Sequence, residues 1–414
     1  MLTQAYLIKN ILLETGFIRH DDGTVMSTET KPATLYIKQG KIYDIFWKEI
    51  PGHLQSLDVI NGCGSLALPG VKDAHIHLDK TYYGGPWTAA EENKTVLDMI
   101  AIEKQLLPKQ IPFLEQRAKA ILDLILSKGT TRIFNHCNVD RTIGTRHFEC
   151  IQSLLSQDYF SKISYETAAF PQHGLLRDDA VSLMKDVLQM GCHAVGGLDP
   201  NAVDRELEKS LDMTFQLALD YKKSIDLHLH ERNDTGKKTL KYVFKLLEQN
   251  PTLQNKVTIS HSFVLYDIHK DGQLEKYANA MKTLGVKLVS SVPIQFKMPL
   301  AELKDYGVTV ELGTDSITDH WTPFGQGDII ERVNIIAQLY GWANEYHLSR
   351  ALYFATGKTP LTDDGVLQWP VKDDVADITL FDASCSAEVI ARISQRTMTI
   401  SQGCISWNSK AIEI

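Results

Sequence analysis

Eight short runs of β-branched and apolar residues recur between residues 65 and 322, and this repetition constrains the fold more than any other feature of the sequence. Most neighbouring runs are separated by enough residues for a helix, and in 205–222 Leu207, Leu211, Phe215 and Leu219 recur at helical spacing. Eight β-α units predict an α/β fold, a TIM-type (β/α)8 barrel of parallel strands with helices outside. The runs are 65–74, 131–135, 163–169, 194–197, 224–227, 256–260, 286–290 and 308–313.

Both ends of the chain have a different pattern. Short alternating segments at 5–13, 34–37, 41–47, 378–381 and 397–400 are separated by Gly, Asp and Ser. A chain of 414 residues exceeds the roughly 250 residues of a barrel, so a second unit is expected. We predict a small flanking β-sandwich built from 1–64 and 365–414, with a structural role, beside a catalytic barrel of 65–364.

Composition and charge exclude several classes of protein. The chain has 43% hydrophobic and 23% charged residues, which is typical of soluble globular proteins. The net charge of −8, and the lack of a basic run with interleaved aromatics, argue against a nucleic-acid partner. No segment approaches the roughly 18 apolar residues of a membrane span, and residues 1–15 alternate as a strand does. Six scattered cysteines without a Cys-x-x-Cys pair indicate reduced thiols, so a cytoplasmic protein is expected, and a homo-oligomer is compatible with the sequence.

Polar residues follow most of the predicted strands at their C-terminal ends, the end at which barrels of this kind carry their active sites. Any one of them is compatible with a helix cap or a turn residue. Their repeated placement favours a functional site. The residues are His75, His77, His136, Gln172, Asp199, His228, Glu231, His261 and Asp315.

Two histidines one residue apart, His75 and His77, end the first apolar run. Alternate residues of a strand point to the same face, so both imidazoles can bind one metal ion. His228 and Asp315, from two other strands, complete a candidate set of three imidazoles and a carboxylate. Such a site suits one divalent ion, Zn²⁺ first, with Fe²⁺ or Mn²⁺ as alternatives.

Three residues near this set are candidates for proton transfer. Asp315 is placed to touch both metal and water, and His261 is either a further ligand or a group that polarises the attacking water. Glu231, three residues after His228, is a candidate acid for a substrate nitrogen and a leaving amine. His230 shares the face of His228 only if the strand geometry continues, so we expect it to contact the substrate or to support a ligand.

The stretches around these residues resemble the amidohydrolase superfamily. Within it, His75-Ile76-His77-Leu78-Asp79-Lys80, Phe170-Pro171-Gln172-His173-Gly174 and Trp321-Thr322-Pro323-Phe324-Gly325 are similar to the branch of cytosine deaminase and N-isopropylammelide amidohydrolase.

The resemblance implies one divalent ion on His75, His77, His228 and Asp315, with His261 and Asp315 activating water and Glu231 transferring protons. It further implies that Gln172 hydrogen-bonds the ring and that Trp321 walls the ring pocket. Two positions depart from cytosine deaminase: Ser316 replaces a second acid after the metal aspartate, and His230 replaces an acid before the glutamate.

We therefore predict a metal-dependent hydrolase that deaminates a cyclic amidine, such as an aminopyrimidine or aminotriazine, with a small heterocycle as its partner. A ring-opening cyclic amidase is the alternative, and an inactive barrel acting as a binding protein is a third. The small cytidine deaminases are excluded because their Pro-Cys-x-x-Cys pair is absent.

Overall fold

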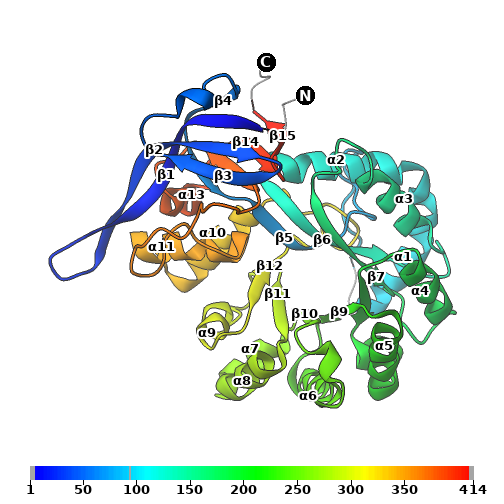
Figure 1. Ribbon diagram of the computed structural model, residues 1–414. Helices are drawn as coiled ribbons and strands as arrows, with labels where there is room; N and C mark the ends of the chain where they lie inside the picture. Colours follow the sequence, from blue (N-terminus) through cyan, green and yellow to red (C-terminus); the bar gives the residue numbers. More distant parts are fainter. Residues whose placement is uncertain (1–4, 93–94, 410–414) are drawn as a thin grey trace.

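The computed structural model describes residues 5–92 and 95–409, which form an eight-stranded barrel and a seven-stranded sheet beside it (Figure 1). The barrel strands follow one another in chain order, and each pairs in parallel with the next along the chain. They are β5 (Val71–Ile76), β6 (Thr130–Asn138), β7 (Ser164–Phe170), β8 (Ala194–Leu198), β9 (Ser224–Leu229), β10 (Val257–His261), β11 (Lys287–Ser290) and β12 (Val310–Leu312). The predicted barrel is confirmed.

The first and last barrel strands meet through the loop that follows β12. The Asp315 main-chain N–H donates to the His75 carbonyl at 2.8 Å, and Ile76 and Asp315 form an isolated parallel bridge. The Asp73 carboxylate adds a side-chain link, because it accepts from both the N–H and the hydroxyl of Thr314. The ring of strands therefore closes at the place where two candidate metal ligands lie.

Helices cover the outside of the ring, as Figure 1 shows. The predicted helix at 205–222 is α5 (Leu207–Tyr221), which buries Leu211 and Phe215 against the strands. The others around the barrel are α1 (Val96–Gln110), α2 (Leu114–Ser127), α3 (Arg146–Leu155), α4 (Ala180–Gln189), α6 (Asn233–Gln249), α7 (Val264–Lys270), α8 (Leu274–Leu284), α9 (Leu300–Asp305), α10 (Ile329–Tyr340), α11 (Glu345–Ala351) and α12 (Tyr353–Thr356). Among the helices of the described residues, none has the length and apolar character of a membrane span.

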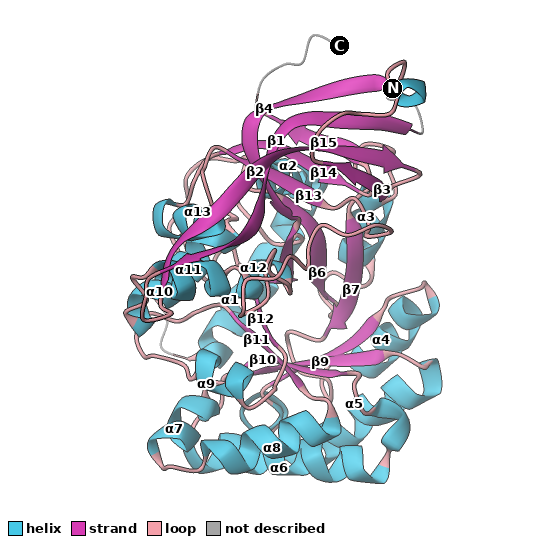
Figure 2. Cartoon of the chain, turned by 60° about the vertical axis from the view of Figure 1, so that its left-hand side comes forward, coloured by secondary structure: helices cyan, strands magenta, loops and turns pink. Residues whose placement is uncertain are grey.

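The flanking unit is one mixed sheet built from both chain ends, which lies above the barrel in Figure 2. Its strands are β1 (Ala5–Arg19), β2 (Val25–Lys38), β3 (Lys41–Phe46), β4 (Asp58–Pro69), β13 (Ile378–Phe381), β14 (Arg396–Ser401) and β15 (Cys404–Asn408), in the order β15-β14-β13-β4-β1-β2-β3. Helix α13 (Ser386–Arg392) connects β13 to β14. Alternate residues such as Leu35 and Ile37 form its separate apolar core.

The predicted run 65–74 is not one strand but two. Residues 65–69 end β4, which pairs with β1 and β13 of the flanking sheet, and β5 begins at Val71. Gly70 lies between them, where an added Cβ would come within 2.3 Å of the Thr131 hydroxyl. A glycine at this crowded position lets one continuous apolar stretch serve two sheets. The exact unit boundaries, 1–64 with 365–414 and 65–364, stay a prediction.

Candidate metal centre and substrate pocket

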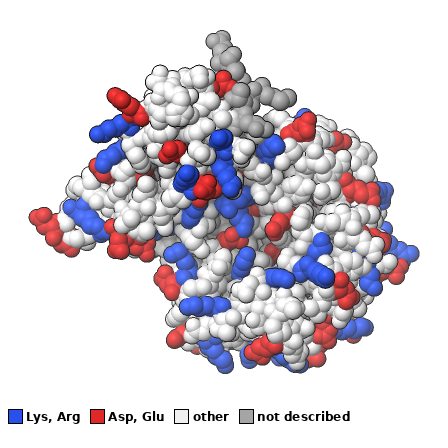
Figure 3. Space-filling view, in the orientation of Figure 1, with Lys and Arg blue, Asp and Glu red and all other residues white. Residues whose placement is uncertain are grey.

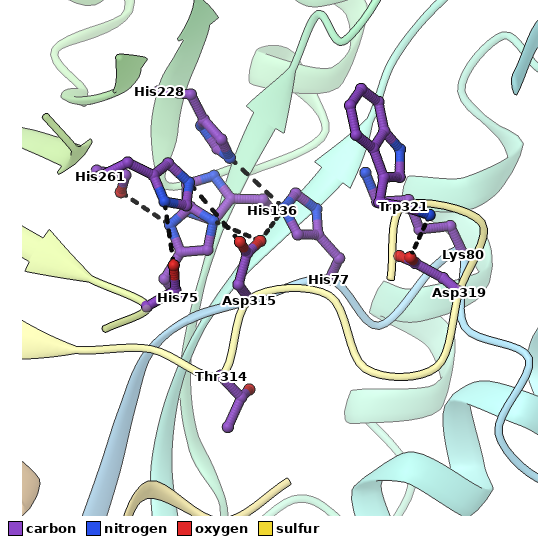
Figure 4. A network of polar contacts seen from close by, with 12 residues as sticks. His75, His77, Lys80, His136, His228, His261, Thr314, Asp315, Asp319 and Trp321 are labelled. Atoms are coloured by element: carbon purple, nitrogen blue, oxygen red, sulfur yellow. Dashed lines mark hydrogen bonds and ion pairs between the residues drawn. The ribbon is translucent and has the colours of Figure 1, made fainter. Parts of the chain in front are cut away.

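His75, His77, His228, His261 and Asp315 converge at the C-terminal end of the barrel strands (Figure 4). His75 is on β5, His228 on β9 and His261 on β10, while His77 and Asp315 follow β5 and β12. The four imidazoles are buried, with 2–3% of each residue exposed. Parallel strands bring their carboxyl ends to one edge, which explains why residues so far apart in sequence meet here.

The spacing of their atoms fits a shared metal ion. Asp315 Oδ1 lies 3.5 Å from the Nε2 atoms of both His75 and His77, and the Nε2 atoms of His77 and His228 are also 3.5 Å apart. Ligands bound tetrahedrally at about 2.0–2.1 Å lie roughly 3.3 Å from one another. In addition, the buried Nε2 of His75 has no hydrogen-bond partner among the described residues. His75, His77 and Asp315 therefore offer three donor atoms that fit one divalent cation, and His228 lies next to them through His77.

A relay of two residues orients His75. Ser260 Oγ donates to Asp226 Oδ1 at 2.7 Å, and its lone pair faces His75 Nδ1 at 2.8 Å. The proton of His75 thus belongs on Nδ1, which leaves the lone pair on Nε2 facing Asp315. Sequence reasoning missed both supporting residues, because neither Ser260 nor Asp226 stands in a recognisable motif.

His136 forms a second possible ligand triad with His75 and His228. Its ring centroid lies 4.0 Å from that of His75 and 4.6 Å from that of His228, and neither of its nitrogens has a hydrogen-bond partner in the described chain. Burial, reinforced by His75, holds its pKa well below the usual range, so the imidazole is neutral and able to bind a metal. The sequence pointed to His136 as a strand-end residue without giving it a role.

Asp315 and His261 lie together on one side of the cluster. His261 Nε2 is 3.9 Å from Asp315 Oδ2. Burial alone would raise the pKa of Asp315, but the neighbouring imidazoles of His261, His75 and His77 hold this pKa well below its usual range. The carboxylate is therefore ionised, as a metal ligand must be.

The structure places His230 against the same cluster. Its ring stacks on that of His261 at 4.5 Å, and its Nδ1 lies 2.8 Å from Asp199 Oδ2. The other Asp199 oxygen accepts from the main-chain N–H groups of His230 and Glu231. Asp199 thus fixes the turn that follows β9.

Glu231 lies next to this turn, and none of its hydrogen bonds, among the described residues, joins the histidine cluster. Its Oε1 accepts from the N–H groups of Asn201 and Ala202, both at 2.9 Å, and Oε2 accepts from the Thr239 hydroxyl at 2.6 Å. Burial raises its pKa, while the Thr239 and Ala202 donors oppose that shift. A carboxyl group whose pKa is raised by burial and lowered by hydrogen-bond donors is suited to exchange protons.

Lys80 connects two of the three residues predicted to contact the substrate, Gln172 and Trp321. Its Nζ donates to Gln172 Oε1 at 2.9 Å and lies 5.4 Å from the Trp321 ring centroid (Figure 4 shows Lys80 and Trp321). Phe170 extends the wall towards the histidines, because its ring stacks on His228 at 4.1 Å. Gln172 and Trp321 therefore lie beside the metal centre, on the side of His77.

Known proteins with similar sequences and structures can be compared with this arrangement. No family model matches the chain. It is 43% identical over 411 residues to the uncharacterised protein YahJ of Escherichia coli strain K12, covering 98% of this chain and 88% of that protein. It is 29% identical over 297 residues to N-isopropylammelide isopropyl amidohydrolase of Pseudomonas sp. strain ADP, covering 68% and 70% of the two chains.

Solved structures agree with these relatives. N-isopropylammelide isopropylaminohydrolase of Burkholderia multivorans superposes with a TM-score of 0.81 at 29% identity, covering 97% of this chain and 98% of that one. The chain belongs to the amidohydrolase superfamily. The 5-methylcytosine deaminase of Klebsiella pneumoniae shares the fold, with a TM-score of 0.76 at 22% identity and 99% of both chains covered.

One buried carboxylate of this amidohydrolase, Glu103 on α1, was missed by sequence analysis. Its Oε2 accepts from His320 Nε2 at 2.9 Å and from Trp321 Nε1 at 2.7 Å, and its Oε1 accepts from Asn138. His173 Nε2 lies 3.6 Å from the same carboxylate. Glu103 thereby ties together the loops after β6, β7 and β12. No motif marks it, because a lone glutamate in an amphipathic helix is ordinarily a surface residue.

Proposed function

We propose that this member of the amidohydrolase superfamily is a metal-dependent deaminase of a small heterocyclic amidine, such as an aminopyrimidine or aminotriazine. The observation that carries the proposal is the convergence of the buried His75, His77 and His228 with the partly exposed, ionised Asp315. The names of the similar proteins, which include an N-isopropylammelide isopropyl amidohydrolase and a 5-methylcytosine deaminase, support this substrate class.

His75, His77, His228 and Asp315 would hold one divalent ion, for which Zn²⁺ is the first candidate and Fe²⁺ or Mn²⁺ the alternatives. When bound, the ion supplies a Lewis acid beside the reacting carbon and makes water more acidic. His136 is a competing ligand, because it forms a second possible triad with His75 and His228.

Hydrolysis requires a proton to leave water and a proton to reach the departing nitrogen. Asp315 accepts the first proton, and His261, 3.9 Å away, polarises the water and stabilises the charge on Asp315. Glu231 gives one proton to the ring nitrogen as the C–O bond forms. It then passes the second water proton, left on the new hydroxyl, to the amine, so that the carbonyl forms, the C–N bond breaks and ammonia or an alkylamine leaves. The proton on Asp315 replaces the one that Glu231 gave up.

Glu231 has to exchange one hydrogen bond to take part in these transfers. Both of its oxygens are engaged by Asn201, Ala202 and Thr239, so the substrate amidine would replace one of these donors. Its raised pKa favours a group that can carry a proton.

Lys80 determines how Gln172 reads the ring. A lysine ammonium only donates, so the Gln172 carbonyl must face Lys80 and the amide NH₂ points elsewhere. Gln172 would therefore donate to a ring carbonyl or a ring nitrogen lone pair. Trp321 would pack on the ring, and His230 would contact its substituents.

The test is amine release by metal-reconstituted protein from cytosine, isocytosine, methylcytosine, creatinine, aminotriazines and pterins. Metal content is measured in parallel. We expect release from at least one ring, and no release by His228→Ala or Asp315→Ala. His53→Ala, at an exposed position, is the matched control and should keep full activity.

Two results would contradict the proposal. Full activity in both ligand variants would remove the metal centre from the reaction. A carboxylic acid product without amine, from a cyclic amide substrate, would instead identify a ring-opening amidase.

A further inference from the structure

A cleft of about 1060 Å³ lies where the flanking sheet meets the barrel, at the end opposite the histidine cluster. Arg132, the third residue of β6, and Ser164, the first residue of β7, form its barrel wall. The catalytic candidates on these strands, His136 and Gln172, come at the other end or after it. The cleft is therefore separate from the proposed catalytic pocket.

The charge of this cleft is opposite to that of the whole protein. Its lining includes Lys41, Arg132, Lys162 and Lys358 against two acids, Asp374 and Asp377, in a chain with a net charge of −8. Figure 3 shows basic side chains, with a few acidic ones between them, near the centre of the face where Figure 1 places β3, β5 and β6.

Among the described residues of the cleft, only one of these cations forms an ion pair with an acid. Asp374 pairs with Lys358 at 3.2 Å, and Asp377 accepts from the Gln402 N–H at 2.8 Å. Lys41 and Lys162 form no ion pair within residues 5–92 and 95–409. Two ammonium groups are thus available to a ligand.

Arg132 is held in place with part of its guanidinium unused. Its NH2 group donates to the carbonyls of Thr356 at 2.8 Å and Gly70 at 3.4 Å, which fixes the plane of the group. Its NH1 group has no hydrogen-bond partner in the described part of the chain and is not a buried atom, so a ligand in the cleft can reach it. A guanidinium fixed in this way suits the oxygens of a carboxylate or phosphate.

Part of the remaining lining is apolar, beside the polar Gln39, Ser164 and Gln402. Trp369, which is 1% exposed, and Ile37, which is 1% exposed, belong to the sheet core, and Ile405 of β15 lies beside them. An inorganic anion would leave this part of the cleft without contacts, whereas an organic anion would cover it.

We propose that this cleft is a second ligand site, which binds a small organic anion through a phosphate or carboxylate group held by Lys41, Lys162 and Arg132. The body of the ligand packs against the partly exposed side chain of Ile405, beside the buried Trp369. The volume accommodates such a molecule, because pockets for small ligands measure roughly 300–1000 Å³.

Titration calorimetry on the metal-loaded protein, at constant ionic strength, tests the proposal with two probes, phenyl phosphate and phthalate. We expect saturable binding of at least one probe, and the stronger one identifies the headgroup. The double variant Lys41→Gln/Lys162→Gln should weaken that binding at least about tenfold, because two charge-assisted contacts are lost. Arg132 is left unchanged, since it also holds Gly70 and Thr356 in place.

Two control variants distinguish binding in the cleft from a general effect of charge and from binding at the metal centre. Lys185→Gln/Lys276→Gln changes the net charge equally on α4 and α8, outside the cleft, and should bind as the unaltered protein does. His228→Ala should also bind normally, because the metal centre is not involved. Absence of saturable binding by both probes, equal affinity in the Lys41/Lys162 variant, or loss of binding in His228→Ala would overturn the proposal.

Discussion

Burial has opposite purposes in the flanking sheet and at the carboxyl end of the barrel. In the sheet it covers apolar side chains such as Leu35, which is 0% exposed, and so contributes stability. At the barrel end it covers His75 and His136. Among the described residues, Nε2 of His75 and both ring nitrogens of His136 lack a hydrogen-bond partner. Unsatisfied buried polar groups cost stability, so they mark a place that function, rather than folding, has shaped.

The largest expected effect is a loss of activity on changing the histidine–aspartate cluster at the carboxyl end of the barrel. Asp315→Asn should lower kcat/KM by on the order of 10³-fold or more, because metal-assisted charge stabilisation contributes several kcal/mol. Metal analysis after dialysis should show reduced occupancy. If Asp315→Asn instead unfolded the protein and left the activity of the remaining folded molecules unchanged, the barrel end would serve stability, as the flanking sheet does.

Leu35→Ala tests the apolar side. We expect the free energy of unfolding to fall by about 2–5 kcal/mol, because the substitution leaves a cavity in the sheet core. Urea denaturation measures this loss, and kcat per folded molecule should not change. A large fall in kcat at full folding would show that the sheet takes part in the reaction.

Paired buried groups at the barrel end should behave differently from the unpaired histidines. Burial lowers the pKa of His173, but the carboxylates of Asp140 and Glu103, 3.5 and 3.6 Å from its two ring nitrogens, outweigh it and raise this pKa to about 9. Because the folded state binds this proton more tightly than the unfolded chain, the charged His173 stabilises the fold. Its contribution to the free energy of unfolding is complete below the unfolded pKa near 6.5 and is lost as the pH rises through about 9.

We expect His173→Gln to lose on the order of 2 kcal/mol of unfolding free energy at pH 6 and much less at pH 10. Urea denaturation of both proteins at the two pH values measures the difference. A deficit that does not depend on pH would mean that His173 stabilises by packing instead of by charge.

The smallest expected effect is at Glu103, a buried group that serves both purposes. Glu103→Gln keeps the shape but removes the charge that holds Trp321 Nε1 and His320 Nε2. We expect KM to rise about tenfold, equivalent to roughly 1.4 kcal/mol, while kcat changes little. Tryptophan fluorescence should report the altered surroundings of Trp321. An equal fall in kcat with constant KM would instead place Glu103 in the chemical step.

The sequence predicted the ring of strands well because apolar runs and polar strand ends are local signals. Each predicted run overlaps a barrel strand, and the prediction that His75 and His77 share one side of the strand end followed from their spacing and from the polar residues at the other strand ends. The split at Gly70 was missed, because a stretch that is buried in two sheets shows no break in its apolar pattern. Glu103 and Lys80 were not predicted as site residues, because their importance comes from contacts between loops that are distant in sequence.

The seam between β5 and β12 has a consequence for how the site is assembled during synthesis. Asp73 and Thr314, which join across it, lie 241 positions apart. His75 and Asp315 therefore cannot meet until nearly the whole barrel has left the ribosome. A chain that stops before β12 exposes imidazoles without their carboxylate, so the histidine–aspartate cluster and the closed ring form in the same step, once residues up to Asp315 have been made.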